Sequence, residues 1–501
     1  MPTLSLIAWL SELSAWTLFV WTGRILGICF VPSVLLQRST RPVASLGWIL
    51  ALVFLPYLGI LLWWVFGRSY LRRSSPRSVE GHRRLSERLR TSPGDGELPW
   101  HADEPPTPLD EALTVKADDA AIQHGLFEPT AGNAVTAYTP PADAFDAFAE
   151  AIEKAKDHIH FQYYVWKSDH TGRRFRDLLA DKAREGVEVR ILYDAVGSVR
   201  MSKRFTAHAA DAGAKVVPFL PVRLWERRLR INFRNHRKFL IVDGRMGFTG
   251  GVNIADEYLE WCDAAFGFQG PLVHQMQQVF AEDWHFATGE SFTGPRYYPY
   301  ATAETSRSSG DMLPDTPVSD VSARMITGGP HDRFQTIHRL FFLSIVSARH
   351  RLWAVTPYFV PDTAILAALQ TAALRGVDVR IILPAQTDVP LAQYAGRTWW
   401  DDLLAAGVRL FEYQPRILHA KLMVIDHRHT LVGSANMDIR SFQLNFEANT
   451  LIDDPEFNDT SAAMFQEMLQ NSKEVKLDDF RHRPRRVRLK EGAARLFTPL
   501  L

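Results

Sequence analysis

Four residue types, histidine, lysine, aspartate and asparagine, recur in two copies at the same spacing. In each copy the lysine stands 2, the aspartate 7 and the asparagine 17 residues after the histidine, and the copies are offset by 183 residues. The members are His236, Lys238, Asp243 and Asn253 in the first copy, and His419, Lys421, Asp426 and Asn436 in the second. Each copy supplies one proton-carrying base and one fixed cation. The sequence therefore predicts one active site, built from two similar halves around a phosphate, with these residues as its catalytic candidates.

The histidine and the lysine of each copy are two residues apart in an apparent strand, so we expect their side chains to leave the same face. That geometry suits two groups that grip one phosphoryl centre. In a phosphodiester exchange one neutral imidazole can attack phosphorus, and a second, protonated imidazole can give its proton to the departing oxygen. The two histidines should therefore titrate as a unit. The near-symmetry of the copies leaves open which histidine attacks.

Small residues precede both asparagines, and they allow a backbone to approach a ligand closely. Asn253, Asn436 and the hydroxyl of Ser434 are candidate donors to the phosphate oxygens. Gly251 takes the place of Ser434 in the first copy. The two halves are therefore not chemically equal.

The acidic residues in and near the two copies are of two kinds. Asp243 and Asp426 each begin a turn, which favours a structural role for both. Each histidine also needs an acceptor that orients its ring. Asp263 and Glu447 are the candidates for this role, 27 and 28 residues after the histidine of their own copy.

Strands and helices must position these residues, and their predicted order occurs twice. Apolar periodicity predicts a helix over 144–155, a strand over 158–165, a helix over 172–184, and strands over 186–194 and 238–242. The second half repeats this order with a strand over 352–359, a helix over 363–374, and strands over 376–384 and 421–425. Self-similarity of this length indicates duplicated α/β units, in which strands alternate with helices.

Length and composition bound the organisation of the chain. A chain of 501 residues exceeds the usual size of one core. The net charge of +1 gives no global field that would attract nucleic acid. Cys29 and Cys262 are too few for a cysteine-rich zinc site, and their positions predict no disulfide. We predict membrane segments over 1–67, a basic juxtamembrane linker over 68–130, a first α/β domain over 131–290, a linker over 291–320 and a second α/β domain over 321–501.

Two apolar stretches, about 4–36 and 44–66, indicate a membrane-bound N-terminus. The second stretch is uncharged and has the roughly 20 apolar residues that a span requires. The first carries Glu12 and Arg24, so it can be a span or an interfacial helix. Eight arginines follow between residues 68 and 90. By the positive-inside rule they place the remainder of the chain in the cytoplasm.

Two more basic stretches suit anionic lipid headgroups. One places Arg223, Arg227, Arg228, Arg230 and Arg234 around Trp225, and the other spans 481–490 with six basic residues. Either can meet a membrane surface or form an ordinary solvated face.

The doubled motif resembles the HKD signature of the phospholipase D superfamily, and the segments around it resemble bacterial cardiolipin synthases. These segments are 234–238, 250–258, 356–362, 433–441, 444–447 and 494–501. Two membrane segments followed by Gly67 and a basic flank also match that family. The resemblance implies two packed phospholipase D-like α/β domains with the active site at their interface, preceded by two N-terminal transmembrane helices.

The resemblance also implies a reaction, without a metal or an organic cofactor. A phosphatidyl group passes from one phosphatidylglycerol to another through a phosphatidyl-histidine intermediate, giving cardiolipin and glycerol. Carried over to this sequence, His236 is the nucleophile, and His419 is the acid that then acts as base for the incoming hydroxyl. The residues that would hold the phosphate are Lys238, Lys421, Asn253, Asn436 and Ser434.

Four other functions compete with this one. A membrane-bound lipid hydrolase of the phospholipase D type would release phosphatidic acid, and another transferase would use phosphatidylethanolamine as co-substrate. A nuclease fits poorly with the net charge and the membrane segments, and both intact motifs disfavour a lipid-binding scaffold without catalysis. The expected partners are phosphatidylglycerol, other anionic phospholipids and the membrane, without nucleic acid. The expected location is the cell membrane, multi-pass, with cytoplasmic catalytic domains. The sequence indicates no oligomeric state.

Overall fold

The structure is a computed structural model, and it describes residues 15–37, 42–64, 107–113, 125–221, 232–299, 318–332 and 334–498. The described residues form two compact units. The smaller unit holds the apolar N-terminal helices, and the larger unit holds the sheet that carries both copies of the motif. The predicted arginine stretches at 68–90 and 223–230, and most of both predicted linkers, lie outside the described residues.

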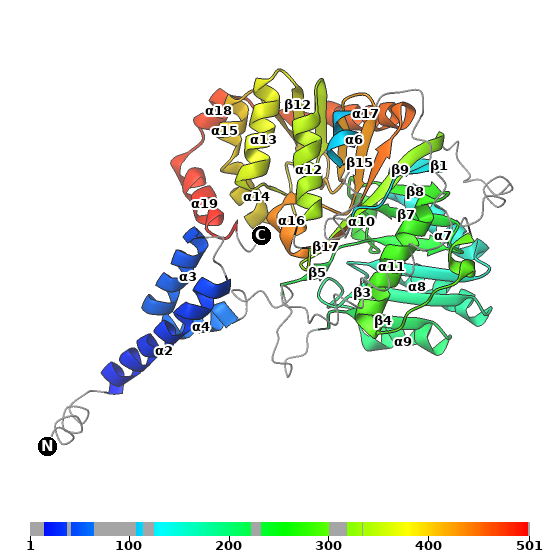
Figure 1. Ribbon diagram of the computed structural model, residues 1–501, viewed down its shortest axis with the longest axis horizontal. Coiled ribbons are helices and arrows are strands. Elements are labelled where there is room, and N and C mark those ends of the chain that lie inside the picture. Colours follow the sequence, from blue (N-terminus) through cyan, green and yellow to red (C-terminus); the bar gives the residue numbers. More distant parts are fainter. Residues whose placement is uncertain are drawn as a thin grey trace. The chain divides into compact units, whose positions relative to one another are not determined.

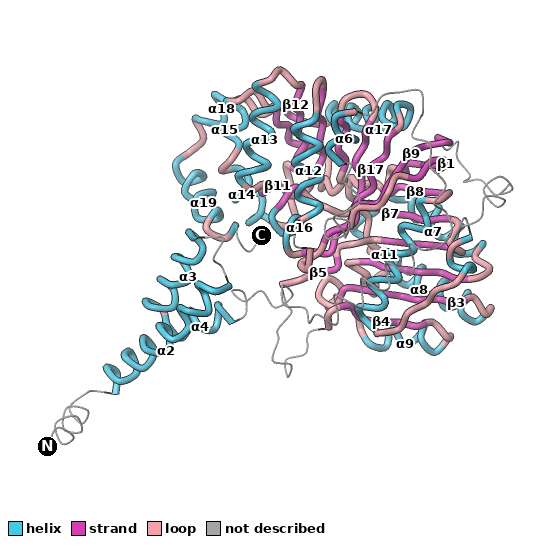
Figure 2. The backbone as a smooth tube through the Cα atoms, in the orientation of Figure 1, coloured by secondary structure: helices cyan, strands magenta, loops and turns pink. Residues whose placement is uncertain are grey.

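The larger unit is built on one continuous mixed sheet that repeats the same strand order twice. In the first half, neighbouring strands are β1 (Thr130–Tyr138), β8 (Ala265–Gln269), β7 (Met246–Gly250), β6 (Phe239–Val242), β2 (His158–Tyr163), β3 (Glu188–Asp194) and β4 (Lys215–Phe219). In the second half they are β9 (Val318–Gly328), β17 (Asn445–Asp453), β15 (His429–Gly433), β14 (Leu422–Ile425), β10 (Arg351–Val355), β12 (Asp378–Pro384), β13 (Arg409–Tyr413) and β18 (Ser472–Glu474). Figure 2 traces these strands in magenta through both halves.

The two halves join where β1 pairs antiparallel with β9, and β9 pairs with β17 on its other side. Strand β5 (Arg234–Asn235) leaves the first half and pairs parallel with β17 of the second. Two short strands of the second half, β11 (Phe359–Val360) and β16 (Met437–Asp438), pair parallel with each other in a separate two-stranded sheet. The predicted duplication of α/β units is confirmed.

Helices cover both faces of the sheet (Figure 1). In the first half they are α7 (Pro141–Lys154), α8 (His170–Arg184), α9 (Lys203–Asp211), α10 (Glu257–Glu260), α11 (Leu272–Thr288) and the 3-10 helix η3 (Pro295–Tyr297). In the second half they are α12 (Thr336–Ser347), α13 (Thr363–Leu374), α14 (Pro390–Arg397), α15 (Trp400–Ala405), α16 (Ile439–Gln443), α17 (Pro455–Gln470), α18 (Leu477–Arg481) and α19 (Arg485–Arg495).

Strand alternation explains why each half has helices on both faces. In β2, Ile159 and Phe161 point into an apolar core shared with α7, α8 and α9. The intervening residues point to the opposite face, where His160 lies 3.1 Å from Gln277 of α11. The second half repeats this arrangement with α12, α13 and α15 in its core and α17 against β10, β14 and β15. Each half is therefore a three-layer α/β/α unit.

Most predicted elements of the larger unit agree with the structure, but the predicted strand 352–359 is divided into β10 and β11. The predicted helix 363–374 and the predicted strands 186–194 and 421–425 match α13, β3 and β14 to within two residues. The histidine and the lysine of each copy lie before β6 or β14 instead of within it, so the prediction that the strand carries them was wrong. The cause is that the backbone at these positions pairs with the other half of the sheet before it enters its own strand.

The described residues of the smaller unit form three apolar helices, α2 (Ala15–Gln37), α3 (Pro42–Phe54) and α4 (Pro56–Leu62). Among the described residues, α2 is the one helix long and apolar enough to cross a membrane. The second apolar stretch does not form the single helix we expected. Pro56 cannot donate a backbone hydrogen bond, and the helix breaks at Leu55 into α3 and α4. The backbones of α3 and α4 lie close together at this break, since a Cβ atom on Gly59 would lie 2.5 Å from the carbonyl oxygen of Ala51.

A short helix, α6 (Pro108–Leu113), lies within the segment predicted to be a linker. Its residues Leu109 and Leu113 belong to the apolar core of the second half. Asp110 of the same helix lies 3.2 Å from His429 on β15. This part of the predicted linker is therefore packed onto the larger unit.

Candidate active site

Each motif histidine is anchored by the backbone of the other half. The N–H of His236 donates to the carbonyl oxygen of Phe446 at 2.9 Å, continuing the pairing of β5 with β17. The N–H of His419 donates to the carbonyl oxygen of Cys262 at 2.7 Å. In both cases the accepting residue stands one position before a candidate orienting acid. The crossed backbone pairing therefore delivers each histidine to an acid of the opposite half.

The side chains of both acids contact these histidines. The Nδ1 atom of His236 lies 3.0 Å from Oε2 of Glu447, and the Nδ1 atom of His419 lies 2.7 Å from Oδ2 of Asp263. All four side chains are buried. Because Nδ1 of each ring faces a carboxylate, Nε2 is the nitrogen that remains for a substrate. Sequence distance associates each acid with its own copy, whereas the structure exchanges the two partners.

Burial and neighbouring charges set the protonation of the pair. Burial lowers the pKa of His236 to about 4, although Glu447 opposes this. Burial also lowers the pKa of His419, and Lys421 adds to the effect. Burial would raise the pKa of Glu447, but His236, Lys238 and Ser434 together hold the pKa below its ordinary value. Without a bound anion the imidazoles are therefore neutral near pH 7, and the carboxylates are ionised.

The two lysines lie beside the histidines and are buried. Nζ of Lys238 donates to the carbonyl oxygen of His236 at 2.6 Å, and Nζ of Lys421 donates to that of His419 at 2.5 Å. Burial lowers the pKa of Lys238 to about 7, and the charge of Lys421 contributes. Burial lowers the pKa of Lys421 to about 8. The charges of both lysines act on the two histidines, so both lysines suit an anion bound between these rings.

The predicted phosphate ligands fall into two groups. Asn253 and Asn436 line the same cavity as the histidines. The Nδ2 group of Asn253 donates to the hydroxyl of Tyr258 at 2.7 Å, and its Oδ1 accepts from the backbone N–H of Val165 at 3.0 Å. Oδ1 of Asn436 is buried, with no hydrogen-bond partner among the described residues.

Lys238 and Lys421 are not among the residues that line this cavity, and neither is Ser434. Its hydroxyl donates to Oε2 of Glu447 at 2.5 Å and accepts from the N–H of Ala448 at 3.0 Å. In the first half a Cβ atom on Gly251 would lie 2.0 Å from Oδ1 of Asp263. The half whose acid is the longer glutamate thus has a serine beside that acid, and the half whose acid is the shorter aspartate has a glycine there.

The two motif aspartates lie at the far end of their strands and outside the cavity. Asp243 accepts hydrogen bonds from the backbone N–H groups of Lys156, Asp157 and His158 at 2.8 to 2.9 Å. Asp426 accepts from three consecutive N–H groups, those of residues 349 to 351, at 2.7 to 3.1 Å. Both aspartates have a positive φ, 54° and 49°. Each therefore ties its turn to the start of the neighbouring strand, β2 or β10.

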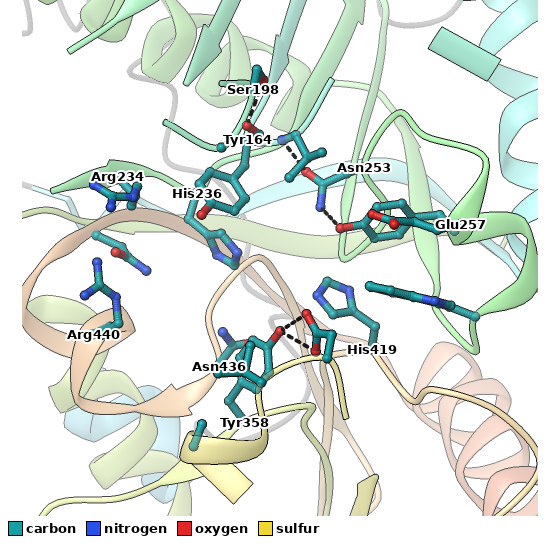
Figure 3. Close-up of a pocket in the computed structure, with 18 of the residues that line it drawn as sticks. Tyr164, Ser198, Arg234, His236, Asn253, Glu257, Tyr358, His419, Asn436 and Arg440 are labelled. Carbon is teal, nitrogen blue, oxygen red and sulfur yellow. Dashed lines mark hydrogen bonds between the residues drawn. The ribbon is translucent and has the colours of Figure 1, made fainter. Parts of the chain in front are cut away.

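The histidines face one cavity of about 470 Å³ (Figure 3). Tyr164 packs against His236 with ring centroids 5.0 Å apart. Tyr258 and Trp261 pack against His419 at 5.5 and 5.3 Å. The sequence pattern did not predict a role for these aromatic residues, or for Tyr358, Asp388 and Arg440, which also line the cavity. Only Arg440, Tyr258 and Tyr358 had a signal, because they lie in segments that carry the family resemblance.

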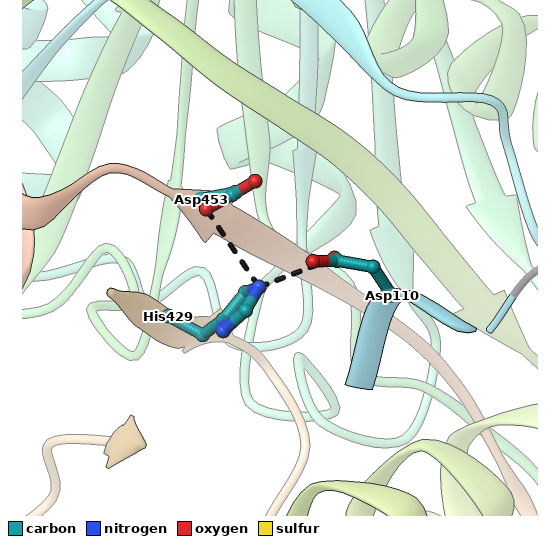
Figure 4. A group of neighbouring side chains, drawn as sticks. All are labelled: Asp110, His429 and Asp453. Atoms are coloured by element: carbon teal, nitrogen blue, oxygen red, sulfur yellow. Dashed lines mark hydrogen bonds and ion pairs between the residues drawn. The ribbon is translucent and has the colours of Figure 1, made fainter. Parts of the chain in front are cut away.

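A second cluster of ionisable groups lies outside this cavity (Figure 4). Asp110, His429 and Asp453 are all buried, with ligand atoms within 4.8 Å of one another. Arg428 bonds to Asp453, and the charges of both aspartates act on the buried Arg324. Guanidinium groups therefore already balance the carboxylates. We interpret the cluster as an ion-pair network that fixes α6.

Comparisons with known proteins agree with this architecture. A family model described as "Cardiolipin synthase, PLD-like domain" matches residues 148–284 and 343–469. A second model, "Phospholipase D-nuclease N-terminal", matches residues 25–68. Both halves of the sheet and the apolar N-terminus thus match known families.

Proteins of similar length match nearly the whole chain. A cardiolipin synthase of Geobacillus sp. (strain WCH70) is 34% identical over 497 residues, which cover 96% of this chain and 95% of that protein. Cardiolipin synthase 2 of Bacillus anthracis is 34% identical over 486 residues, which cover 93% and 89%. The crystal structure of phosphatidylserine synthase from Haemophilus influenzae Rd KW20 has a TM-score of 0.57 at 18% identity, covering 73% of this chain and 95% of that one. This last likeness is one of fold.

Proposed function

The chain belongs to the cardiolipin synthase family with PLD-like domains, and from this membership we propose that it joins two phosphatidylglycerol molecules into cardiolipin and glycerol. It is a phosphatidyltransferase. The observation that carries the mechanism is the crossed contact of His236 with Glu447 and of His419 with Asp263. Each half supplies one histidine and the acid that orients the other histidine, so chemistry requires both halves.

In the first step Nε2 of His236 attacks the phosphorus of one phosphatidylglycerol. The bond from phosphorus to the glycerol oxygen breaks, and His419 gives that oxygen its proton. The depressed pKa of His236 leaves its Nε2 lone pair available near pH 7. The anionic phosphodiester raises the proton affinity of His419, and Asp263 stabilises the resulting imidazolium.

In the second step the hydroxyl of another phosphatidylglycerol attacks phosphorus. The bond from phosphorus to His236 breaks, and His419 accepts the hydroxyl proton. Lys238 and Lys421, together with Asn253 and Asn436, hold the phosphate oxygens during both steps. Asp243 and Asp426 support the strands and do not touch the substrate. Ser434 acts on Glu447, not on the phosphate.

The N-terminal unit anchors the enzyme in the cell membrane. Helix α2 is apolar along a length that suits a span. The second apolar stretch, broken at Pro56, packs against α2 and completes a two-segment anchor. The arginines between residues 68 and 90 place the catalytic unit on the cytoplasmic side.

A reconstitution assay tests this function. We expect the purified full chain in phosphatidylglycerol vesicles to form cardiolipin and glycerol in equal amounts. Phosphatidic acid without cardiolipin would instead identify a hydrolase. Ethanolamine release, in vesicles that also contain phosphatidylethanolamine, would identify the alternative co-substrate. His236→Ala should abolish product formation, and unchanged activity would contradict the mechanism.

A further inference from the structure

The two ends of the active-site cavity break the symmetry of the duplicated fold. The offset of 183 residues makes Arg440 the counterpart of Glu257, and both line the cavity. Ser198 and Asp388 also line it and each follow their strand, β3 or β12, by four residues. Equivalent positions thus differ in charge, although the histidines and the lysines between them are the same.

Cationic side chains lie at the end beside His236. Arg234 and Arg440 lie on the side of His236 that faces away from His419 (Figure 3). Burial lowers the pKa of Arg440, and the charge of Arg234 lowers it further. The counterpart of Arg234 in the second copy is Ile417, so this pair of cations occurs at one end only.

Acidic and aromatic side chains lie at the end beside His419. Glu257 lines this end and forms an ion pair with Lys167 at 2.7 Å. Asp388 accepts a hydrogen bond from the hydroxyl of Tyr358 at 2.8 Å. With Trp261, these groups suit the hydroxyls of a neutral headgroup. Lys167 offsets the charge of Glu257, which leaves Asp388 as the acid that disfavours an anionic phosphate at this end.

Transfer between two phosphatidylglycerol molecules brings two phosphodiesters into one cavity. The donor phosphate lies between the histidines, where the two lysines offset its charge. The second phosphate also needs a cation, because an unpaired charge in a partly buried site is strongly disfavoured. Guanidinium groups bind phosphate oxygens in a bidentate manner. Asp438 also lines the cavity near Arg440. The N–H of Ser441 donates a hydrogen bond to this carboxylate at 2.7 Å, so a backbone donor already holds it.

We propose that Arg234 and Arg440 form a second phosphodiester subsite, which holds the phosphate of the acceptor lipid while the donor phosphate lies between His236 and His419. This inference rests on the proposed phosphatidyl transfer and names the residues that select an anionic acceptor. In the step concerned, the acceptor hydroxyl oxygen bonds to phosphorus, the bond from phosphorus to His236 breaks, and the proton passes to His419. The arginines bind the acceptor and take no part in bond exchange.

The test compares a charged and a neutral acceptor with the full chain in phosphatidylglycerol vesicles. Labelled glycerol 3-phosphate and labelled glycerol are supplied at equal concentration, and initial incorporation into lipid is measured together with cardiolipin formation. We expect Arg440→Gln to lower cardiolipin formation and glycerol phosphate incorporation by at least about tenfold, and glycerol incorporation by less than about threefold. Arg234→Gln should act in the same direction, and Arg440→Lys should recover part of the loss.

The control is Arg174→Gln on α8, which removes an exposed guanidinium paired with Asp146 and should leave all three rates unchanged. A parallel fall of the charged and neutral reactions in both Arg440 variants would overturn the subsite. An unchanged preference for the charged acceptor would overturn it as well. If the wild type only hydrolyses phosphatidylglycerol, the proposed function fails. The subsite is then judged by whether glycerol 3-phosphate inhibits hydrolysis in the wild type more strongly than in Arg440→Gln.

Discussion

The Nδ1 atom of His236 lies 3.0 Å from a carboxylate oxygen of Glu447, although the two residues are separated by 211 positions in the chain. The reciprocal contact joins His419 and Asp263 at 2.7 Å. Both contacts follow from one feature of the fold, the backbone bonds by which each motif segment pairs with the other half. The two halves of the duplicated fold are therefore interlocked at the proposed catalytic residues.

The orienting role of Glu447 can be tested with Glu447→Gln. The amide keeps the size of the side chain but removes the negative charge that fixes and stabilises the His236 ring. We expect kcat to fall by about 100-fold or more, with a smaller change in KM. Asp263→Asn should give a similar loss through His419. Because Ser434 also bonds to Glu447, Ser434→Ala should reproduce a weaker form of the Glu447→Gln effect. Wild-type kcat in Glu447→Gln would contradict the assignment.

The identity of the nucleophile can be tested with phosphatidyl-p-nitrophenol, whose leaving group needs no proton. We expect His419→Asn to release one equivalent of p-nitrophenol and to retain a covalent phosphatidyl group on His236, which mass spectrometry of the digested protein would locate. His236→Asn should show neither the burst nor the adduct. A burst in His236→Asn with an adduct on His419 would reverse the two roles.

Deprotonation of the two lysines should limit activity at alkaline pH. The pKa of Lys238 is lowered to about 7 and that of Lys421 to about 8, so the cationic forms are lost as pH rises through this range. The value of kcat/KM reports the free enzyme. We therefore expect kcat/KM to be highest below about pH 7 and to decline above about pH 8. Lys421→Met should be slow at every pH and should lose part of this decline. A profile that stays flat up to pH 10 would contradict the prediction.

Much of this site follows from the sequence, because duplicated spacing identifies residues that act together. The doubled spacing predicts the histidines and the asparagines, which line one cavity, and the lysines, which bond to the backbone of the histidines. The need of each histidine for an acceptor predicts Asp263 and Glu447, which contact the histidines. The exchange of those partners could not be predicted, since it depends on strand pairing between residues far apart in the chain. The aromatic lining was missed for a similar reason, because Tyr164 and Trp261 reach the cavity from loops whose path depends on the whole sheet. The break at Pro56 was visible in the sequence, but apolar composition alone suggested a single span.

The motif aspartates should affect stability and leave catalysis intact. Asp243 accepts three backbone N–H groups at the start of β2 and has a φ of 54°, which alanine adopts less readily than aspartate or asparagine. We expect Asp243→Ala to lower the free energy of unfolding by about 2 kcal/mol, and Asp243→Asn to cost less because it keeps one acceptor oxygen. Urea unfolding measures this change, and Asp426→Ala should give a comparable loss in the second half. The kcat of each folded variant should remain within about threefold of the wild-type value, since neither side chain lines the cavity. A large loss of kcat at unchanged stability would instead assign these aspartates to the chemistry.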